Sequence, residues 1–563
     1  MVSRRLRRAR NPLSTPDPSH EPAAPADAAR VPLWAVLLAG VGGGLAIRFS
    51  MPEANLHVPA LFAWAPALVL ARRLPPGRRF RLGWLLGFTT EVTLMWFIAG
   101  TMVRMTGLPF AAGAALAVAY GLWHGLLAGV FLWLAEPLRE AAEARLPRSG
   151  VFAVATAYAA VEWLWPQVFP LSIAHAFWDV GPVVSLTAYV GVPGLAFLVL
   201  LVNAVVAEGW LSRSARRVVP GVVAIAALLA LALGWHLHVA ATDPYDTLRV
   251  AIVQPNYTVE EKQRAASRRD KAAAAAQREA FLERITAQIK ALPPDTYDLV
   301  VASEGAFPYS WRVDADRFAD GAPMPTTVRA TKRLQEAIAS GPRTDAIVGG
   351  LRLGPSERVR NAAVQLGADG GIRAYYDKQI LMPFGEYMPL RSVFPSLAEA
   401  VPGISNFEEG DAACAFAVGD VSVACGICYE TCFSLPTRAD LGSASLLVNL
   451  TIDTWFGTTN APESHLMLQA PRAAELGVPL VRGALSGISA VVEPTGDVVA
   501  TLPLDTAGVL DVNVPLRDVT PPWRVIGPVV PWLFEVITLL LLVDVVARRR
   551  RARRAAATPA APA

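Results

Sequence analysis

Three residues whose types suit acyl-transfer chemistry stand at the ends of apolar runs in this 563-residue chain. They are Glu304 in VVASEGAFP, Lys378 in YYDKQILMPFGEYMP and Cys428 in VACGICYE. A carboxylate can remove the proton of a thiol, the thiolate can attack a carbonyl carbon, and an ammonium can stabilise the oxyanion that forms. A lone Glu or Lys is usually a solvated charge, so the prediction rests on the three residues together.

Cys428 is crowded by other thiols, because Cys425 and Cys432 are within four residues of it. A structural zinc site needs a fourth ligand and usually a second paired motif, and no companion CxxC occurs in the chain. We therefore predict no metal and no cofactor. A redox pair of Cys425 and Cys428 suits an oxidising compartment, and it stays open beside the interpretation of Cys428 as one nucleophile with buried neighbours.

The stretch 243–523, which contains these residues, has the pattern of an α/β protein. Buried strands are predicted at 248–253, 299–303, 346–351 and 445–450, hairpins at 359–377 and 414–427, and helices near 259–292, 326–340 and 462–476. Strands alternating with helices predict a layered fold. Because layered α/β folds place their chemistry just past strand ends, we expect Glu304, Lys378 and Cys428 to converge.

The rest of the chain is dominated by long uncharged runs, in keeping with 53% hydrophobic residues and a mean hydropathy of +0.38. Runs near the roughly 20 residues that cross a bilayer occur at 32–48, 56–71, 83–103, 109–135, 151–165, 183–207, 218–241 and 525–547. We predict about eight transmembrane helices, although the second and fifth runs are short. The first run lacks a convincing cleavage site and is interpreted as a signal anchor.

Basic residues predict the topology. Arginines precede the first run and follow the second, fourth, sixth and last, whereas 49–55 and 166–182 contain no Lys or Arg. The positive-inside rule then places both termini in the cytoplasm and 243–523 on the far side of the membrane. The net charge of +4 is too small to predict a nucleic-acid partner.

These signals divide the chain into five segments. They are a disordered cytoplasmic N-terminus at 1–30, a membrane domain of about seven helices at 31–242, an exported catalytic domain at 243–523, a last transmembrane helix at 524–547 and a basic cytoplasmic tail at 548–563. The sequence carries no signal for the oligomeric state.

Several motifs together resemble the nitrilase-type domain of apolipoprotein N-acyltransferases. They are SEGAFP around Glu304, PFGEYMP after Lys378, Cys428-Tyr429-Glu430, DTWFG at 453–457, Gln254-Pro255-Asn256 and Asn361. The likeness covers about residues 31–547, including the eight-span arrangement. It implies a multi-span α-helical membrane domain joined to a four-layer αββα sandwich, and it implies Glu304, Lys378 and Cys428 as a catalytic triad.

The resemblance also implies a reaction. An enzyme of the bacterial inner membrane would take a fatty acyl chain from a phospholipid onto Cys428 and pass it to the N-terminal α-amine of a diacylglyceryl-cysteine apolipoprotein. A thioester suits such two-step chemistry, because an amine can attack it and it can persist while substrates exchange.

Five further residues are assigned around the triad. Glu386 and Glu430 match positions that support activity in the family, and Tyr429 adjoins the nucleophile. Trp455 and Phe456 are predicted as loop anchors or acyl-chain contacts, with core packing as the alternative for the aromatic residues.

The chain departs from the family pattern at Leu171, Ile452 and Leu485. None belongs to the triad, so the departures bear on how donor and acceptor are bound. The open alternatives are a membrane-bound amidase or nitrile hydrolase, an acyltransferase with a different acceptor, and a non-catalytic envelope scaffold.

Overall fold

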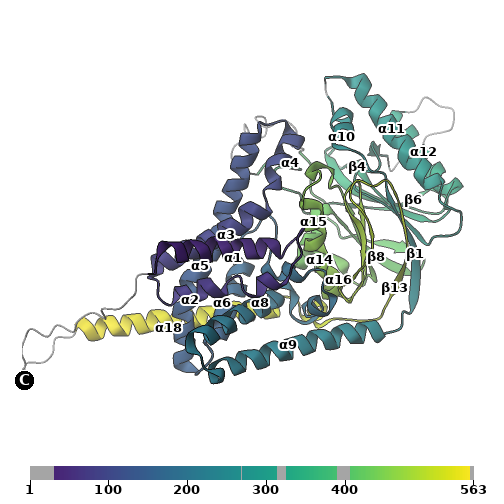
Figure 1. The fold of residues 1–563 in the computed structure, drawn as a ribbon. Coiled ribbons are helices and arrows are strands. Elements are labelled where there is room, and N and C mark those ends of the chain that lie inside the picture. The colour runs from purple at the N-terminus through teal and green to yellow at the C-terminus, as the bar shows by residue number, and fades with distance from the viewer. Residues whose placement is uncertain (1–30, 268, 313–324, 355, 390–405, 558–563) are drawn as a thin grey trace, which may run out of the picture.

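The computed structural model describes residues 31–267, 269–312, 325–354, 356–389 and 406–557. The segments 1–30 and 558–563, predicted to be disordered, lie outside these residues. The chain forms a helical bundle and a two-sheet domain, which are on opposite sides of Figure 1. The principal helices of the bundle are α1 (Leu33–Phe49), α2 (Ala65–Ala71), α3 (Pro76–Leu94), α4 (Phe97–Thr106), α5 (Phe110–Arg145), α6 (Gly150–Leu164), α8 (Thr187–Ser212), α9 (Ala215–Ala241) and α18 (Val529–Ala557).

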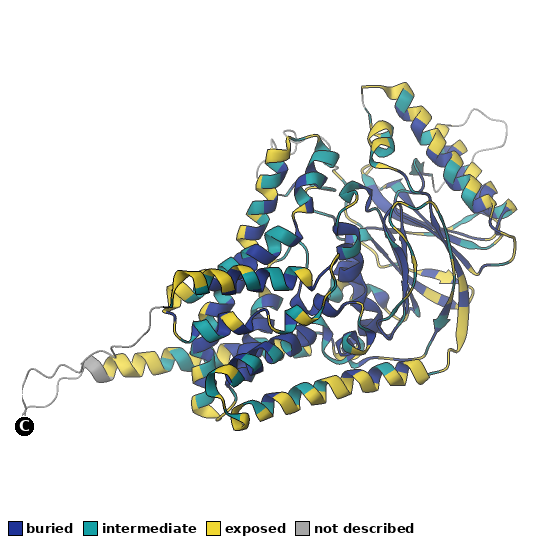
Figure 2. Cartoon of the chain, viewed as in Figure 1, coloured by how far each residue is buried: buried dark blue, intermediate teal, exposed yellow. Residues whose placement is uncertain are grey.

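Four of these helices, α5, α8, α9 and α18, are long and apolar enough to cross a membrane. A fifth candidate is the pair α3 and α4, which is bent by 46°, and shorter apolar helices lie at Leu33–Phe49, Val58–Ala71 and Gly150–Leu164. Figure 2 shows many exposed residues along α9 and α18. Among them are the large apolar residues Val223, Leu237, Trp532 and Leu540. An apolar surface of this extent fits contact with lipid and not with water.

The helices differ from the predicted runs in three places. The run 56–71 contains a 3-10 turn, η1 (Val58–Leu61), followed by the short α2, because prolines stand near the start of both elements. The run 83–103 is broken at Met95-Trp96. The arginines at 548–554, predicted to form a tail beyond the last span, continue α18 as helix to Ala557.

The two-sheet domain contains one mixed sheet on each side of a shared core. The first sheet has the order β13-β1-β2-β4-β5-β6, with β3 paired to β4, and the second has the order β12-β11-β10-β9-β8-β7. The strands of the first sheet are β1 (Asp246–Gln254), β2 (Leu299–Ala302), β3 (Ser310–Trp311), β4 (Asp345–Leu353), β5 (Val359–Leu366), β6 (Ile372–Asp377) and β13 (Gly508–Leu516). Those of the second are β7 (Phe416–Val418), β8 (Val421–Ile427), β9 (Leu446–Thr451), β10 (Leu480–Ala484), β11 (Ser489–Val492) and β12 (Val498–Leu502).

Alternating side chains on the strands build the layers. On β1, Val250 and Ile252 enter the core between the sheets, whereas Ala251 and Val253 face the helices α11 (Lys271–Lys290) and α12 (Thr326–Ser340). The second sheet is covered by α14 (Ser434–Leu441), α15 (Ala461–Gln469) and α16 (Pro471–Leu476), which lie between that sheet and the bundle in Figure 1. The result is the αββα sandwich that the family resemblance implied.

Two predicted helices are divided in the structure. The stretch 259–292 forms α10 (Val259–Ala265) and α11, and Asp270 caps the second helix by accepting a hydrogen bond from the Ala273 amide. The stretch 462–476 forms α15 and α16, with Pro471 at the start of the second. Both breaks matter for the site, since α10 and α15 each carry residues that approach it.

The bundle and the sandwich share one hydrophobic cluster, which runs from α8 to α15, α16 and the outer face of the second sheet. Helix α8 is kinked at Gly191, where φ is +64° and an added Cβ would lie 2.6 Å from the Trp523 ring. The Val192 amide near the kink donates to Glu475 Oε1 of α16 over 3.0 Å. A polar contact and an apolar core therefore join the two parts.

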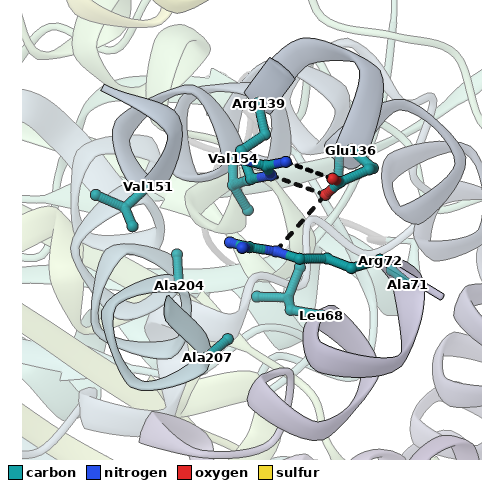
Figure 3. A pocket seen from close by; sticks show the side chains of 10 residues that line it. Leu68, Ala71, Arg72, Glu136, Arg139, Val151, Val154, Ala204 and Ala207 are labelled. Atoms are coloured by element: carbon teal, nitrogen blue, oxygen red, sulfur yellow. Dashed lines mark hydrogen bonds and ion pairs between the residues drawn. The ribbon is translucent and has the colours of Figure 1, made fainter. Parts of the chain in front are cut away.

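Figure 3 shows charged residues that line a pocket of the bundle, with Arg72 and Arg139 both beside Glu136. Arg72, after α2, forms an ion pair with buried Glu208 of α8 and lies 3.9 Å from Glu136 of α5. Glu136 is also paired with Arg139, and Glu208 lies 3.4 Å from the exposed Arg217. Since a buried carboxylate is costly without a partner, these contacts hold α2, α5 and α8 in register.

We predict that Arg72→Met lowers the stability of the protein by about 3 kcal/mol, the usual cost of removing one partner of a buried pair. Arg217→Met is the matched control, and because that side chain is 54% exposed its loss should cost below about 1 kcal/mol. Thermal unfolding of both variants in one detergent measures the difference. Equal destabilisation by the two changes would contradict the assigned role of Arg72.

Candidate active site

The three residues predicted from strand ends converge in the structure. Glu304 follows β2 by two residues and Lys378 immediately follows β6, both in the first sheet, whereas Cys428 immediately follows β8 of the second. Their side chains meet where the ends of the two sheets face each other, and the side chain of Lys378 is only 1% exposed. The fold therefore brings a carboxylate, an ammonium and a thiol into one enclosed space.

Lys378 is held between two carboxylates. Its Nζ lies 2.8 Å from Glu386 Oε2 and 3.9 Å from Glu304 Oε1. Asn361 of β5 joins the two acids, because its Nδ2 donates to Glu304 Oε1 over 2.6 Å and to Glu386 Oε1 over 2.8 Å. Glu304 Oε2 is buried without a conventional hydrogen-bond partner among the described residues, which leaves it available to a reacting group.

The pKa values follow from this arrangement. Burial raises the pKa of Glu304, and Glu386 adds to the rise, while Lys378, Asn361 and the Cys428 thiol act in the opposite direction. Burial alone would lower the pKa of Lys378, but the two carboxylates outweigh it and raise that pKa well above its ordinary value. Lys378 is therefore a fixed positive charge, and Glu304 is a stronger base than an ordinary carboxylate.

Cys428 occupies a strained backbone position. Its φ is +56°, in the left-handed region that residues other than glycine seldom adopt. Burial, reinforced by Glu304, raises the pKa of its thiol well above the ordinary value. The resting thiol is thus neutral, and a nucleophile forms only when a neighbouring base takes its proton.

A buried polar network holds the Cys428 backbone. Gln469 Nε2 donates to the Cys428 carbonyl over 2.8 Å, and Gln469 Oε1 accepts from Arg482 Nε over 2.8 Å. Arg482 binds Asp453 Oδ2, and His465 Nδ1 lies 2.7 Å from Asp453 Oδ1. Burial alone would raise the pKa of Asp453, but Arg482 and His465 lower it to about 2. An ionised carboxylate thus anchors the chain of contacts that ends at Cys428.

Sequence reasoning gave no role to Gln469, His465 or Arg482. A signal existed for Arg482, since a charged residue within the apolar run VPLVRGAL needs a buried partner. The partner, Asp453, was noted only as part of the DTWFG motif. Nothing in the sequence indicates that Gln469 reaches the Cys428 carbonyl.

Glu430 joins the segment after Cys428 to the segment after Lys378. Its Oε1 accepts from the amides of Gln379 and Ile380 over 2.6 and 2.9 Å, and its Oε2 accepts from the Ile427 amide over 2.7 Å. Burial raises its pKa to about 7, although Lys378 and these amides oppose the rise. Through these contacts Glu430 connects the ends of β6 and β8, and both of its carboxylate oxygens are bound to backbone amides and not to the Cys428 thiol.

Tyr429 turns toward the helical bundle. Its hydroxyl donates to the Val168 carbonyl, and its ring lies 5.9 Å from Phe169 and 4.8 Å from Phe433. Val168 and Phe169 belong to the loop after α6. The residue next to Cys428 therefore contacts the loop that follows α6 of the bundle.

The loop η5 (Thr454–Phe456), which holds Trp455 and Phe456, is fixed by α4. Arg104 donates to both carbonyls of this pair over 2.6 Å. The Phe456 ring packs 5.5 Å from Phe97 and 6.2 Å from His465. This geometry favours the predicted role of loop anchors, although acyl-chain contact remains a prediction.

The departures from the family pattern occupy packed positions. Leu171 is 6% exposed and Leu485 fully buried, and Ile452 packs against the core beneath the first sheet. Leu171 also lines a cavity of about 320 Å³ between the bundle and the sandwich, together with Trp165, His175, Phe433 and Arg472. Of the three departures, Leu171 is the one that lines this cavity.

The neighbouring thiols lie in different layers. Cys425 points into the core between the sheets and interacts with Cys414, whereas Cys432 packs in the cluster shared with the bundle. Burial raises the pKa of both thiols. Cys425 lies within β8, whereas Cys428 stands past the end of that strand, where the charges of Glu304 and Lys378 act on it.

Comparisons with known proteins agree with this architecture. A family model described as "Carbon-nitrogen hydrolase" matches residues 249–522, and one described as "Apolipoprotein N-acyltransferase N-terminal domain" matches residues 43–205. The apolipoprotein N-acyltransferase of Brucella melitensis is 30% identical over 545 residues, which span 90% of this chain and 94% of the relative. That of Gloeobacter violaceus is 30% identical over 82% of this chain and 84% of the relative.

Solved structures similar to the sandwich include an amidase from Nesterenkonia and Nit3 from Saccharomyces cerevisiae, both of the nitrilase superfamily. The amidase is 17% identical, covers 49% of this chain and 93% of its own, and has a TM-score of 0.31. Nit3 is 16% identical, covers 48% of this chain and 91% of its own, and has a TM-score of 0.32.

We predict that Glu386→Gln shifts the pH dependence of any reaction that starts at Cys428. Glu386 raises the pKa of Glu304, so its neutralisation should lower that pKa and move the acidic limb of the rate profile to lower pH. Because a weaker base removes a proton more slowly, the plateau rate should also fall, by about 10-fold or more. The measurement is the rate of Cys428 modification by a labelled acyl donor across pH, and an unmoved acidic limb would contradict the electrostatic role.

Proposed function

The chain belongs to the apolipoprotein N-acyltransferase family, and we propose that Glu304, Lys378 and Cys428 carry out its N-acylation of lipoproteins through a thioester. The observation that carries this assignment is the enclosed set itself. A buried carboxylate oxygen without a conventional partner, a fixed ammonium and a neutral thiol share one space.

In the first half-reaction, Glu304 takes the proton of Cys428 as the sulfur attacks the ester carbonyl of a phospholipid. The oxyanion that forms is stabilised by Lys378, and losing such a donor typically costs on the order of 10²-fold in rate. When the intermediate collapses, the carbon–oxygen ester bond breaks. The proton on Glu304 passes to the leaving oxygen of the lysophospholipid, so that an acyl-thioester remains on Cys428.

In the second half-reaction, the N-terminal amine of a diacylated apolipoprotein attacks the thioester carbonyl. The new carbon–nitrogen bond forms, the carbon–sulfur bond breaks, and Glu304 carries one amine proton to the departing sulfur. Lys378 faces the same oxyanion position in both halves. One enclosed site thus serves two substrates in turn, as a ping-pong reaction requires.

Supporting roles are proposed for residues that hold this geometry. Glu386 keeps Lys378 charged and oriented, and Glu430 ties the segment after Cys428 to the segment after Lys378. Tyr429, Trp455 and Phe456 connect the site to α4 and the loop after α6. Acyl chains would pass along these aromatic side chains.

We propose a membrane arrangement of eight spans, with the three short helices and the bent pair counted as four of them. Both termini would be in the cytoplasm of a bacterium and 243–523 outside, which follows from the arginine distribution. The segments 31–242 and 524–547 would then form the membrane domain. Both substrates carry lipid chains. The contact of Tyr429 with the loop after α6 and that of Arg104 of α4 with η5 suit a site that opens toward the outer leaflet.

A labelled phospholipid acyl chain provides the deciding experiment. We expect label on Cys428 that is chased by a diacylated lipopeptide and not by water, with no label in Cys428→Ala. Release of label as free fatty acid would indicate the hydrolase alternative, and absence of label would leave the scaffold alternative. A chase by a different amine only would indicate an acyltransferase with another acceptor.

Replacement of the neighbouring thiols tests whether Cys428 acts alone. Cys425→Ala and Cys432→Ala should each keep appreciable labelling and transfer, because those thiols lie in the packed layers on either side of the second sheet. Loss of labelling in either variant, with Tm unchanged, would restore the redox or metal interpretation. Complementation of a strain that lacks the transferase, followed by mass spectrometry of lipoprotein N-termini, extends the test to the natural acceptor.

A further inference from the structure

A second lysine, Lys262, lies beside the turn that carries Glu304. Lys262 of α10 extends toward the turn after β2, where a Cβ added to Gly305 would lie 3.5 Å from Lys262 Nζ and 4.0 Å from Ile452 Cδ1. Gly305 follows Glu304 directly, and the charge of Glu304 acts on Lys262. Among the described residues, no hydrogen bond or ion pair is formed by the Lys262 ammonium.

The element that carries Lys262 is firmly placed. Thr258 and Glu261 form a capping box at the start of α10, and Glu261 is paired with Arg284 of α11 at 2.6 Å. Gln263 Nε2 donates to the Arg104 carbonyl of α4 over 2.8 Å. Since both flanks of α10 are fixed, the position of Lys262 above Gly305 is set by the fold.

The two lysines at this site differ in their surroundings. Lys378 lies between two carboxylates that raise its pKa. Burial lowers the pKa of Lys262 to about 8, and the Glu304 charge only partly opposes this shift. Groups whose environments push their pKa values apart are those that divide acid and base roles. Lys262 can exchange a proton near neutral pH, whereas Lys378 cannot.

The other charged side chains named around α10 have contacts with groups other than Lys262. Glu261 faces Arg284, Arg264 contacts Gln277, and the Arg104 guanidinium binds the carbonyls of η5. Glu304 is therefore the charged group that bears on Lys262 from the packed elements.

The proposed second half-reaction requires a second base in addition to Glu304. An α-amine has an ordinary pKa of about 7.7 to 8.0, so the acceptor arrives largely as an ammonium at neutral pH. Between arrival and amide formation its nitrogen loses two protons. One reaches the departing sulfur through Glu304, and the other needs a second acceptor.

We propose that Lys262, in its neutral form, accepts the proton of the acceptor ammonium that Glu304 does not carry to sulfur. The assignment rests on the proposed function. It makes Lys262 a base for the transfer half-reaction and leaves it without a task in thioester formation, where the single thiol proton passes through Glu304 to the lysophospholipid.

The test separates the two half-reactions. Full-length wild type, Lys262→Met and Lys262→Arg are loaded from a phospholipid with a labelled acyl chain, and the thioester is chased in single turnovers. Two chasing nucleophiles are compared: a diacylated lipopeptide with a free α-amine, and hydroxylamine, which is neutral at about pH 7 and therefore brings one proton fewer. Lys271→Met, at the exposed start of α11, is the matched control.

We expect both Lys262 variants to load at near wild-type rates and to transfer to the lipopeptide on the order of 10²-fold more slowly at about pH 7. Discharge by hydroxylamine should be unchanged within about 2-fold. The lipopeptide deficit should shrink well above the α-amine pKa of about 8, where the acceptor also arrives neutral. Lys271→Met should match wild type throughout.

Five results would overturn the proposal or the function on which it rests. Normal transfer by Lys262→Arg would show that a positive charge suffices, as expected if this position binds a lipid phosphate. Equal loss with hydroxylamine, or slower loading, would show a general positioning role. Absence of label on the wild type would overturn the proposed function itself, whereas labelled wild type with normal transfer by Lys262→Met would overturn the role of Lys262 alone.

Discussion

The burial of one ammonium constrains the whole site. Lys378 is almost without solvent contact, and a buried charge is tolerated only when paired and hydrogen-bonded. Glu386 and Glu304 provide the charges, and Asn361 holds both acids at distances that suit one cation. These groups come from the ends of β2, β5 and β6 and the loop that follows. The register of the first sheet is therefore tied to the position of a single nitrogen atom.

The second sheet must then present the Cys428 thiol against this fixed charge. Cys428 leaves β8 in a left-handed conformation that costs energy, and the structure offsets this cost by binding its carbonyl from Asn449 and Gln469. Behind Gln469 stand Arg482 and Asp453 in an interior where an unpaired charge would be expensive. The strained backbone at Cys428 is thus held by Gln469, which could not move without breaking its contact with the buried Arg482.

Strand periodicity made much of this arrangement predictable. The apolar runs before Glu304 and Cys428 predict strands that end close to these residues, and the hairpin at 359–377 places Lys378 at a strand end. Helix bounds were less predictable, because the break between α10 and α11 depends on the local cap at Asp270 and on the packing of two separate faces. The contacts of Gln469 and Arg482, and the position of Lys262 beside Gly305, could not be predicted, since each joins segments whose proximity only the tertiary fold creates. The sequence also did not predict the bend between α3 and α4 or the helical conformation of the C-terminal arginines. Composition indicates whether a segment prefers lipid or water, but it does not determine the conformation of the backbone.

The joint core of bundle and sandwich bears on the choice between transfer and hydrolysis. A thioester is open to water as well as to amines, so a transferase must favour the amine by access and not by reactivity alone. Here Tyr429, the residue after Cys428, packs against Phe169 and Phe433, and Arg104 of α4 binds the η5 loop. The surfaces around Cys428 are thus contributed jointly by the sandwich and the apolar helices. The packing that keeps Lys378 out of water would also limit the water that reaches an acyl group on Cys428, whereas a lipid-anchored amine could approach along the bundle.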